Sequence, residues 1–493
     1  MEMMLYLQLP PPLEFVSERI ADPKALDTFR VNYQKFRCGG AQGAKGEVQQ
    51  LLVSVHQTSE EKYEAEEKAY ELAKDVRIDP MIDEGRFISA FERSKRMRSV
   101  VVVETGIVDA LAARALDVIP RKCHRSSIYV VTDSVTDALY GDVVLDGLLG
   151  AGLGASKLVI PSETDASGEN STEMHKSLTT FSNLADQILA GGVDKRSCIV
   201  SLGGGVVNNI CGYLASSIYR GLALVHVSTT FMGQVDAAID FKQAVNHCAN
   251  RIQSRTAPLV WGLLFFFTTA GCGKNLLGSY YPAATVVLDP SLLTTQSTRH
   301  RRNGLAEAAK HGMVHSTDLL DYIRAGNIDD PAYLDGVVRR TISVKVPTLT
   351  RYDESDFNEM APQYGHAPAH AVEFLSWHGA CNEPLLHGEA VAIGMCVSAE
   401  VAFIMGVCAE SVVEEHYAIV EALGLPSCVP PELDLDKVID KLSYDKHTLS
   451  GKPTMGLLVK MGKMYEKDGV YGQPVDADIL REAFEINQDR AAK

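Results

Sequence analysis

Short apolar runs alternate with amphipathic helical patterns from Ser99 onward, as is typical of an α/β domain. The runs are rich in β-branched residues and end at turn residues; they cover 99–104, 127–132, 158–160, 197–202, 222–227 and 285–289. Because they are apolar throughout, they predict strands that are buried on both faces of a parallel sheet. After Asp289 the periodicity becomes helical up to the C terminus, with a long run over 389–405 that ends at Gly406.

This pattern predicts an α/β fold in which a parallel-sheet, nucleotide-binding domain is followed by an all-helical domain. We place the α/β domain at 96–296 and the helical domain at 297–493. Residues 1–95 differ from both and are predicted to be an N-terminal helical extension. Within and just beyond it, the charged stretch 59–98 with its spaced apolar residues predicts one or two solvated helices.

One segment, 249–271, does not fit the α/β pattern. Its part 257–271 is a run of fifteen largely apolar residues without charge, shorter than the roughly 20 that a membrane-spanning helix needs. The flanking sequences QAVNHC and CGKNLLG read continuously when the segment is removed. We therefore interpret 249–271 as a late insertion or a retained non-coding stretch. The alternative is a loop that packs its aromatic residues on a dimer surface.

The composition narrows the class of partner. The chain has 493 residues, 46% hydrophobic and 22% charged, and its formal net charge is −16. Nucleic acids and anionic membranes need a basic surface, so neither is an expected partner. The ten cysteines are scattered without a C-x-x-C pair, and Pro10–Pro12 interrupt the N-terminal apolar run. Both features favour a cytoplasmic protein with buried thiols and no signal peptide.

A glycine-rich turn follows the fourth apolar run. Three consecutive glycines, 203–205, separate this predicted strand from a helical pattern, where backbone N–H groups approach a pyrophosphate. The next predicted strand leads into the hydroxyls of Thr229 and Thr230, and Asp133 follows an earlier strand. Ligands of open α/β sheets bind at the carboxyl edge of the strands. A dinucleotide site is therefore favoured, with a merely tight turn as the alternative.

Histidines and a carboxylate in the helical part suit a metal ion. Glu307 lies in GLAEAAKHG, His366 and His370 in YGHAPAH, and His387 in LLHGEAVAIGM. Two imidazoles and a carboxylate leave the fourth position of a tetrahedral zinc open, as in catalytic sites. His366 and His370 share one face of a helix, provided that the helix begins here, because Pro368 is tolerated only in a first turn.

Basic residues also stand in otherwise apolar or glycine-rich contexts. On an acidic protein such residues suggest a pocket for phosphate and for carbonyl or hydroxyl oxygens, although a single one of them is more often a solvated surface residue. They are Arg220, Lys242, Lys274, Lys310, Lys345 and Lys446.

Over residues 96–480 the sequence resembles the sugar-phosphate cyclases of the dehydroquinate synthase superfamily. The motifs occur in the family's order; they are GGGVVNNICG, YRGLALVHVSTTF, QVDAAIDFKQAVNH, GKNLLGSYYP, GLAEAAKHG, YGHAPAHAVE and LHGEAVAIGM. The resemblance implies a homodimer with an NAD-binding α/β domain and a helical metal-binding domain. It also implies a carbon–oxygen lyase acting on phosphates, in which NAD transiently oxidises a sugar phosphate, phosphate is eliminated, and re-reduction and an aldol addition close a carbocycle.

The resemblance also implies roles for individual residues. Zinc, or another divalent metal such as cobalt, would be held by Glu307, His366 and His387. The substrate would be contacted by Asp236, Lys242, Asn275, Lys310, Lys345, His370 and Lys446, with Arg220 reaching the site of the neighbouring subunit. NAD would be contacted by Asp133, Glu173, Lys176, Gly204, Gly205, Val206, Asn209, Thr229, Thr230, Lys242, Lys274 and Thr295.

Departures from the family pattern narrow the range of substrates that the resemblance implies. Asn209 stands where dehydroquinate synthases carry Asp, and 357–363 (FNEMAPQ) lacks the Gly-Leu-Arg and Asn expected before the Gly-His motif. With RGLALVHV and FKQAVN, the chain is more similar to the 2-deoxy-scyllo-inosose synthases, although Gln363 replaces their usual Glu. Valiolone-type synthases often lack the histidine that His370 provides. A 3-dehydroquinate synthase, a metal-dependent alcohol or polyol dehydrogenase and a non-catalytic relative remain alternatives.

Overall fold

The computed structural model describes residues 3–6, 99–164, 170–248, 272–350, 356–381, 383–442, 448–449 and 452–491. They form two compact units: unit 1 comprises Met1–Gly106, Thr230–Asp236 and Val286–Lys493, and unit 2 comprises Ile107–Thr229 and Ala237–Thr285. The segment 249–271 and nearly all of the predicted extension 1–95 lie outside the described residues. Of that extension the structure describes only the strand β1 (Met3–Tyr6), which pairs antiparallel with β2 (Val100–Val103).

Unit 2 is built on a parallel sheet. Neighbouring strands in it follow the order β8 (Ala223–Ser228), β7 (Cys198–Gly203), β3 (Ile128–Asp133) and β4 (Ala155–Ile160), and every pair is parallel. β3, β7 and β8 are buried along their whole length, which confirms the prediction from their apolar runs. The prediction is wrong for the run 158–160 in β4, because β4 is the last strand in the sheet order and Val159 is 43% exposed. The longer helices of this unit are α6 (Leu111–Val118), α8 (Asp142–Gly150), α9 (Leu178–Ala190) and α10 (Gly205–Ser217).

An antiparallel hairpin completes unit 2. It consists of β9 (Lys242–Cys248) and β10 (Cys272–Tyr280), and Cys248 is the register partner of Cys272. The segment 249–271 therefore connects two chain ends that already face each other. The remaining short elements of unit 2 include α7 (Ser134–Thr136), the π-helical turn Asp137–Gly141, β5 (Glu163–Thr164), β6 (Asn170–Ser171) and the 3-10 turns Arg121–Cys123, Glu173–His175 and Ile218–Arg220.

Unit 1 is mainly helical. After β11 (Thr285–Leu288), whose first residue belongs to unit 2, and the turn Pro290–Thr295, its helices follow one another along the chain. They are α11 (Thr298–His315), α12 (Thr317–Arg324), α13 (Pro331–Thr350), α14 (Phe357–Met360), α15 (His366–Leu375), α16 (His387–Ile404), α17 (Glu410–Ala422), α18 (Leu435–Leu442) and α19 (Ala477–Arg490). The predicted fold class, a parallel-sheet α/β region followed by a helical part, is confirmed.

Short strands also occur in this helical part, which the helical periodicity after Asp289 does not indicate. They are β12 (Thr448–Leu449), β13 (Lys452–Gly456), β14 (Leu458–Lys460), β15 (Lys463–Met464) and β16 (Gly472–Pro474). β13 and β16 pair antiparallel, and Met455 and Leu457 from this region belong to the same core as α15, α16 and α19.

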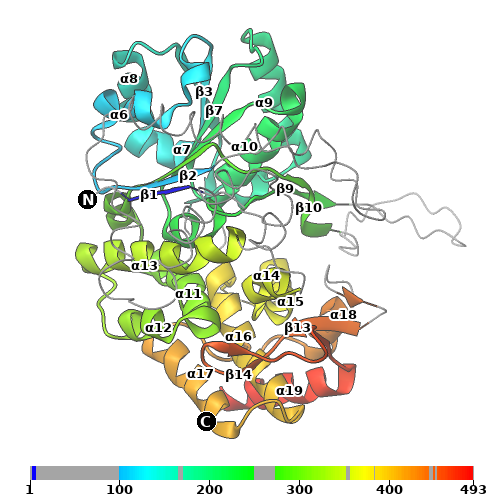
Figure 1. Ribbon diagram of the computed structural model, residues 1–493. Coiled ribbons are helices and arrows are strands. Elements are labelled where there is room, and N and C mark those ends of the chain that lie inside the picture. The colour runs from blue at the N-terminus through cyan, green and yellow to red at the C-terminus, as the bar shows by residue number, and fades with distance from the viewer. Residues whose placement is uncertain are drawn as a thin grey trace, which may run out of the picture. The chain divides into compact units, whose positions relative to one another are not determined.

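Helix α16 is the centre of the unit 1 core. It contacts α11, α15, α17 and α19 (Figure 1), and every residue from Gly388 to Ala402 is buried. Among the described residues it is the one helix that is long and apolar enough to cross a membrane, yet 83% of it is buried inside the protein. A helix that is apolar on all sides and surrounded by other helices is a core helix. The packing of α16 therefore holds the first residues of this helix, which begins at His387, in a fixed position.

We predict that replacing 249–271 by Asn-Gly leaves unit 2 intact. The backbones of Cys248 and Cys272 already lie opposite each other in the antiparallel hairpin. An Asn-Gly dipeptide forms the tight turn that closes such a hairpin. The shortened protein should be at least as soluble, with a midpoint of thermal unfolding within about 2 °C of the full chain. Calorimetry and phosphate release are the measurements. An inactive but equally stable shortened protein would show that 249–271 belongs to the catalytic domain.

Candidate active site

Three residues from different helices of unit 1 form a candidate metal centre. Glu307 comes from α11, His366 is the first residue of α15, and His387 is the first residue of α16. Their ligand atoms all lie within 4.8 Å of one another. The local sequence explains the position of His366, because Gly365 adopts a φ of +77°, which favours glycine, and the helix begins directly after it. Pro368 then falls in the first turn, as predicted.

Both histidines turn the same ring nitrogen toward Glu307. His366 Nε2 lies 3.4 Å and His387 Nε2 3.5 Å from Glu307 Oε1, which is longer than a good hydrogen bond. Their other nitrogens are engaged elsewhere: His387 Nδ1 lies 3.1 Å from Glu373 Oε2, and His366 Nδ1 lies 3.2 Å from the Tyr364 carbonyl. Such outer contacts orient metal-binding histidines. The donor set and its spacing fit a divalent metal shared by the three residues.

Glu373 is a functional candidate that the sequence analysis missed. It lies on α15, one helical turn after His370, and is 2% exposed. The signal was the spacing of seven residues from His366, which puts both side chains on the same face of the helix. His370 itself is half-buried, and its ring centre lies 5.6 Å from that of His366 and 6.3 Å from that of His387.

The charged groups in and around the cluster shift the pKa values of its three residues in different directions. Burial alone would raise the pKa of Glu307, but the Lys310 ammonium and the two histidines hold it well below its ordinary value. Burial together with Lys310 lowers the pKa of His366 to about 3. Burial opposes a charge on His387 as well, yet Glu373 and Glu307 raise its pKa to about 9. The two imidazoles therefore differ because only one of them has a second carboxylate beside it.

Two buried lysines lie next to this cluster. Lys310 contacts Glu307 Oε2 and donates to the Pro362 carbonyl at 2.8 Å. Lys345 Nζ lies 2.5 Å from Asp236 Oδ1 and donates to the Asp236 carbonyl at 2.9 Å. Burial would raise the pKa of Asp236, but Lys345 and then Lys310 hold it well below its ordinary value. Each buried ammonium therefore has a carboxylate partner, as burial of charge requires.

His311 is a second residue that the sequence analysis missed. Its Nε2 lies 3.3 Å from Asp236 Oδ1, and its ring stacks on His315 with centres 5.8 Å apart. His311 follows Glu307 by four residues on α11, so both face the same side of the helix. A carboxylate on one helix position and a histidine one turn later was the available signal.

The predicted cofactor residues of unit 2 gather at the carboxyl edge of its sheet. Asp133 ends β3, where Oδ1 accepts hydrogen bonds from the N–H groups of Val135 and Thr136 at 3.0 and 2.9 Å. The Thr229 N–H donates to the Gly203 carbonyl at 3.0 Å, so the ends of β7 and β8 are tied together. A Cβ on Gly203 would lie 3.2 Å from Asp133 Oδ2, which brings the glycine turn and this carboxylate side by side.

The start of α10 has the features of an anion site. Gly204 is the residue before the helix and makes no side-chain capping bond to the N–H groups of the first turn, which includes Gly205 and Val206. A Cβ on Gly203 would lie 2.7 Å from Val207 Cγ2, so a side chain does not fit in this turn. The uncapped N–H groups at the sheet edge leave donors for a pyrophosphate.

The remaining predicted residues are distributed over both units. In unit 2, Lys242 opens β9, Asn209 lies in α10, and Glu173, Lys176 and Asn275 form one hydrogen-bonded cluster. Arg220 follows α10 with a φ of +64° and is exposed. In unit 1, the Thr230 hydroxyl accepts from the Gly233 N–H, and Thr295 ends the turn after β11. Lys446 and the side chain of Lys274 lie outside the described residues.

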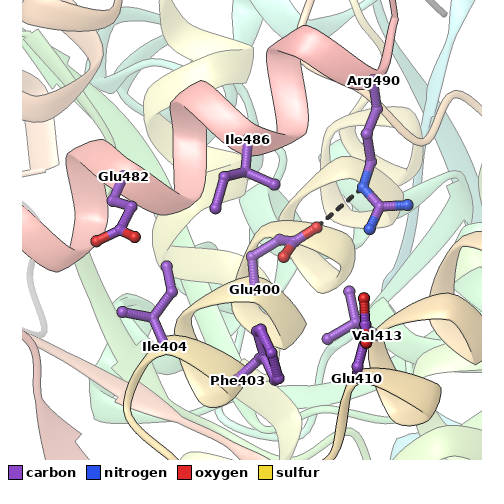
Figure 2. A pocket seen from close by; sticks show the side chains of 8 residues that line it. All are labelled: Glu400, Phe403, Ile404, Glu410, Val413, Glu482, Ile486 and Arg490. Atoms are coloured by element: carbon purple, nitrogen blue, oxygen red, sulfur yellow. Dashed lines mark ion pairs between the residues drawn. The ribbon is translucent and has the colours of Figure 1, made fainter.

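A pocket of about 390 Å³ lies elsewhere in unit 1 (Figure 2). Phe403, Ile404 and Ile486 line it, and Arg490 Nε lies 3.1 Å from Glu400 Oε1 inside it. It surrounds the last turn of α16, whereas His387 is the first residue of that helix, about 20 Å away at 1.5 Å per residue. This pocket is therefore not part of the candidate metal centre.

Comparisons with known proteins agree with this arrangement. The family model described as 3-dehydroquinate synthase N-terminal matches residues 169–259, and the one described as 3-dehydroquinate synthase C-terminal matches residues 304–448. A 2-deoxy-scyllo-inosose synthase of Streptoalloteichus tenebrarius is 32% identical over 387 residues, which cover 77% of this chain and 89% of that protein. This chain belongs to the dehydroquinate synthase family.

Other members of the dehydroquinate synthase family are nearly as similar. A 3-dehydroquinate synthase of Pelobacter propionicus is 29% identical over 355 residues, covering 71% of this chain and 88% of that protein. The crystal structure of 2-deoxy-scyllo-inosose synthase complexed with carbaglucose-6-phosphate, NAD+ and Co2+ has a TM-score of 0.64 at 24% identity, covering 80% and 98% of the two chains. The 2-epi-5-epi-valiolone synthase from Streptomyces hygroscopicus with NAD+ and Zn2+ bound has a TM-score of 0.62 at 25% identity, covering 79% and 96%.

We predict that His387→Ala abolishes stoichiometric zinc binding. The substitution removes one of three donors and leaves a carboxylate and one imidazole, which is too few for a stable zinc site. Metal analysis of the purified variant after dialysis is the measurement. Full retention of zinc would overturn the assignment of Glu307, His366 and His387 as the ligands.

We predict that Glu373→Gln weakens metal binding by about 10- to 100-fold without abolishing it. The carboxylate contacts His387 Nδ1 and thereby orients the opposite nitrogen toward Glu307. Competition with a chelator of known affinity measures the dissociation constant directly. Glu359→Gln, an exposed position on α14, is the matched control and should leave the constant unchanged. Equal affinity in both variants would show that Glu373 does not support the metal centre.

Proposed function

We propose that this chain is a sugar-phosphate cyclase that converts a sugar phosphate into a carbocycle with release of inorganic phosphate. The observation that carries the proposal is the cluster of the buried Glu307 and His366 with the part-exposed His387, beside two buried ammonium groups, Lys310 and Lys345. A metal centre flanked by fixed cations suits a substrate with hydroxyl oxygens and a phosphate. The family relationship and the matching cyclase structures support the same class.

The proposed cofactors are NAD and a divalent metal, zinc or cobalt, as named for the related structures. Glu307, His366 and His387 would hold the metal, and the first turn of α10 with Asp133 and Thr229 would bind NAD. When bound, the metal supplies polarisation of a substrate oxygen, and NAD supplies reversible hydride uptake, so the reaction has no net oxidation.

The side chains of the site supply binding and orientation. Asp236 fixes the Lys345 ammonium with one short contact, so this cation is already in place before a ligand arrives. Lys310 is fixed in the same way between Glu307 and the Pro362 carbonyl. Charges that are held in place in a buried site stabilise developing negative charge without reorganisation. His370, at the rim of the cluster, is placed to exchange a proton with a bound substrate.

The substrate that we propose is a sugar phosphate without a carboxylate group, such as glucose 6-phosphate, as for 2-deoxy-scyllo-inosose synthase. The Lys310 contact with Pro362 places 357–363 next to the cluster, and the stretch DFNEMAPQYG at 356–365 contains no Lys or Arg. A substrate carboxylate, such as that of the dehydroquinate precursor, requires a cation for binding. This absence supports the inosose-type assignment over dehydroquinate synthase.

The proposal also covers the compartment, the kind of metabolism and the oligomeric state of the protein. The chain would act in the cytoplasm, in secondary metabolism, as a homodimer. Arg220 would reach the active site of the partner; it is exposed and, like Tyr219 before it, has a left-handed backbone conformation. Analytical ultracentrifugation tests the dimer, and mixed dimers of Arg220→Ala and Lys345→Met chains test the shared site by recovery of activity.

Phosphate release distinguishes the candidate functions. Purified protein with NAD and zinc or cobalt should release phosphate from glucose 6-phosphate, and at most weakly from sedoheptulose 7-phosphate or the dehydroquinate precursor. NADH absorbance should not accumulate, because the hydride is returned. Net NADH production with a simple polyol, without phosphate release, would instead identify a metal-dependent dehydrogenase.

We predict that Lys345→Met lowers the rate of phosphate release by at least about 100-fold while zinc remains bound. The substitution removes a buried cation beside the metal centre and leaves the three metal ligands in place. Steady-state kinetics and metal analysis on the same preparation are the measurements. Lys437→Met, at an exposed lysine of α18, is the control. Activity within a few-fold of the parent would exclude Lys345 from the reaction.

We also predict that the gene does not restore growth without aromatic supplements to a strain that lacks dehydroquinate synthase. The segment expected to face a substrate carboxylate has no cation, so the dehydroquinate precursor should bind poorly. The parallel measurement is phosphate release from that precursor by the purified protein. Robust complementation would show that the substrate assignment is wrong.

A further inference from the structure

Four polar residues of unit 2 form a closed ring of hydrogen bonds. Glu173 belongs to the turn Glu173–His175, Lys176 follows that turn directly, Asn246 lies on β9, and Asn275 lies on β10. The sequence analysis selected three of them for NAD or substrate binding and did not select Asn246. The fourth residue is the one that joins the other three.

Asn246 uses both ends of its side-chain amide. Its Nδ2 donates to Glu173 Oε1 at 2.9 Å, and its Oδ1 accepts from the Asn275 N–H at 3.0 Å. Its backbone N–H donates to the Lys176 carbonyl at 2.8 Å. Lys176 Nζ then donates to Asn275 Oδ1 at 2.6 Å, and the Lys176 N–H donates to the Glu173 carbonyl at 3.0 Å, which closes the ring of four residues. Every side chain of the ring is thus fixed by another member.

The backbone of Asn275 is part of this arrangement. Its φ is +56°, a left-handed conformation that asparagine adopts more readily than most residues other than glycine. The bond from its N–H to Asn246 Oδ1 holds this conformation, and the bond from Lys176 orients its side chain. Asn275 is itself exposed, so packing does not position it.

The chemistry of the amide explains why asparagine suits position 246. The site needs a donor toward a carboxylate and, on the same short side chain, an acceptor for a backbone N–H. Aspartate would keep the acceptor but place a second carboxylate against Glu173. Leucine, of similar size, would provide neither group.

We infer that Asn246 is a positioning residue that fixes the NAD-binding turn at Glu173 and Lys176 and the substrate residue Asn275 relative to one another. This inference rests on the proposed function, because the roles of those three residues come from it. Asn246 acts through its neighbours and needs no contact with either ligand. Its loss should therefore weaken the binding of NAD and of the sugar phosphate together.

The test is NAD affinity, measured by titration calorimetry in the absence of sugar phosphate. Asn246→Asp should raise the dissociation constant of NAD by at least tenfold, and Asn246→Leu should raise both this constant and the KM for glucose 6-phosphate by similar factors. The midpoint of thermal unfolding should change by no more than about 2 °C, because the ring lies at a part-exposed edge. Asn183→Asp, an exposed change of the same charge in α9, is the control.

A double variant separates positioning from a general structural role. In Glu173→Gln with Asn246→Asp the donor and the acceptor are exchanged, so the hydrogen bond between the two side chains is restored. NAD affinity of the double variant should return to within about threefold of Glu173→Gln alone. Variants at Asn246 that bind NAD like the parent, or a double variant no better than Asn246→Asp, would overturn the inference. A parent protein that does not bind NAD at all would overturn the proposed function and the inference with it.

Discussion

The burial of ionised groups in unit 1 is the constraint on which the candidate site depends. Glu307 is completely buried, and so large a desolvation is tolerated only with charged partners in contact. Lys310 provides one such partner on the same helix and His387 another at the start of α16, while the uncharged His366 brings the first turn of α15 to the carboxylate. Removing one member of such a buried set costs about 3–5 kcal/mol, so the positions of α11, α15 and α16 are mutually fixed.

The apolar helix α16 holds one end of this charged cluster in a fixed position. Its first residue is a metal-binding candidate, and the residues that follow are buried among four other helices. The adjacent Glu389 binds Arg299 through two contacts of 2.7 and 2.8 Å and accepts from the Leu386 N–H at 2.8 Å. The start of the helix is thus fixed by polar contacts and its body by packing, which is what precise placement of a ligand requires.

In unit 2, the candidate binding residues are placed by the shared direction of parallel strands and by hydrogen bonds. The ends of β3, β7 and β8 lie at one edge because parallel strands of similar length share a direction, and this brings Asp133, the glycine turn and Thr229 together. In the same unit, the ring through Asn246 links the exposed Asn275 by hydrogen bonds to the partly buried Glu173 and the buried Lys176. Exposed polar residues that must hold one orientation need such a network.

The sequence by itself determined the elements and the candidate chemistry. The run 197–202 is apolar at four of its six positions and carries no charge, and that pattern favours a strand buried on both faces. The order of the motifs around Glu307, His366 and His387 indicated the family and the metal ligands. Carboxylate and imidazole groups are known metal ligands, so the residue types alone suggest this chemistry. The tertiary structure alone decided the supporting contacts. Glu373 and Asn246 act on residues that are 14 and 29 positions away, and such pairings depend on how helices and hairpins pack, which no local pattern encodes.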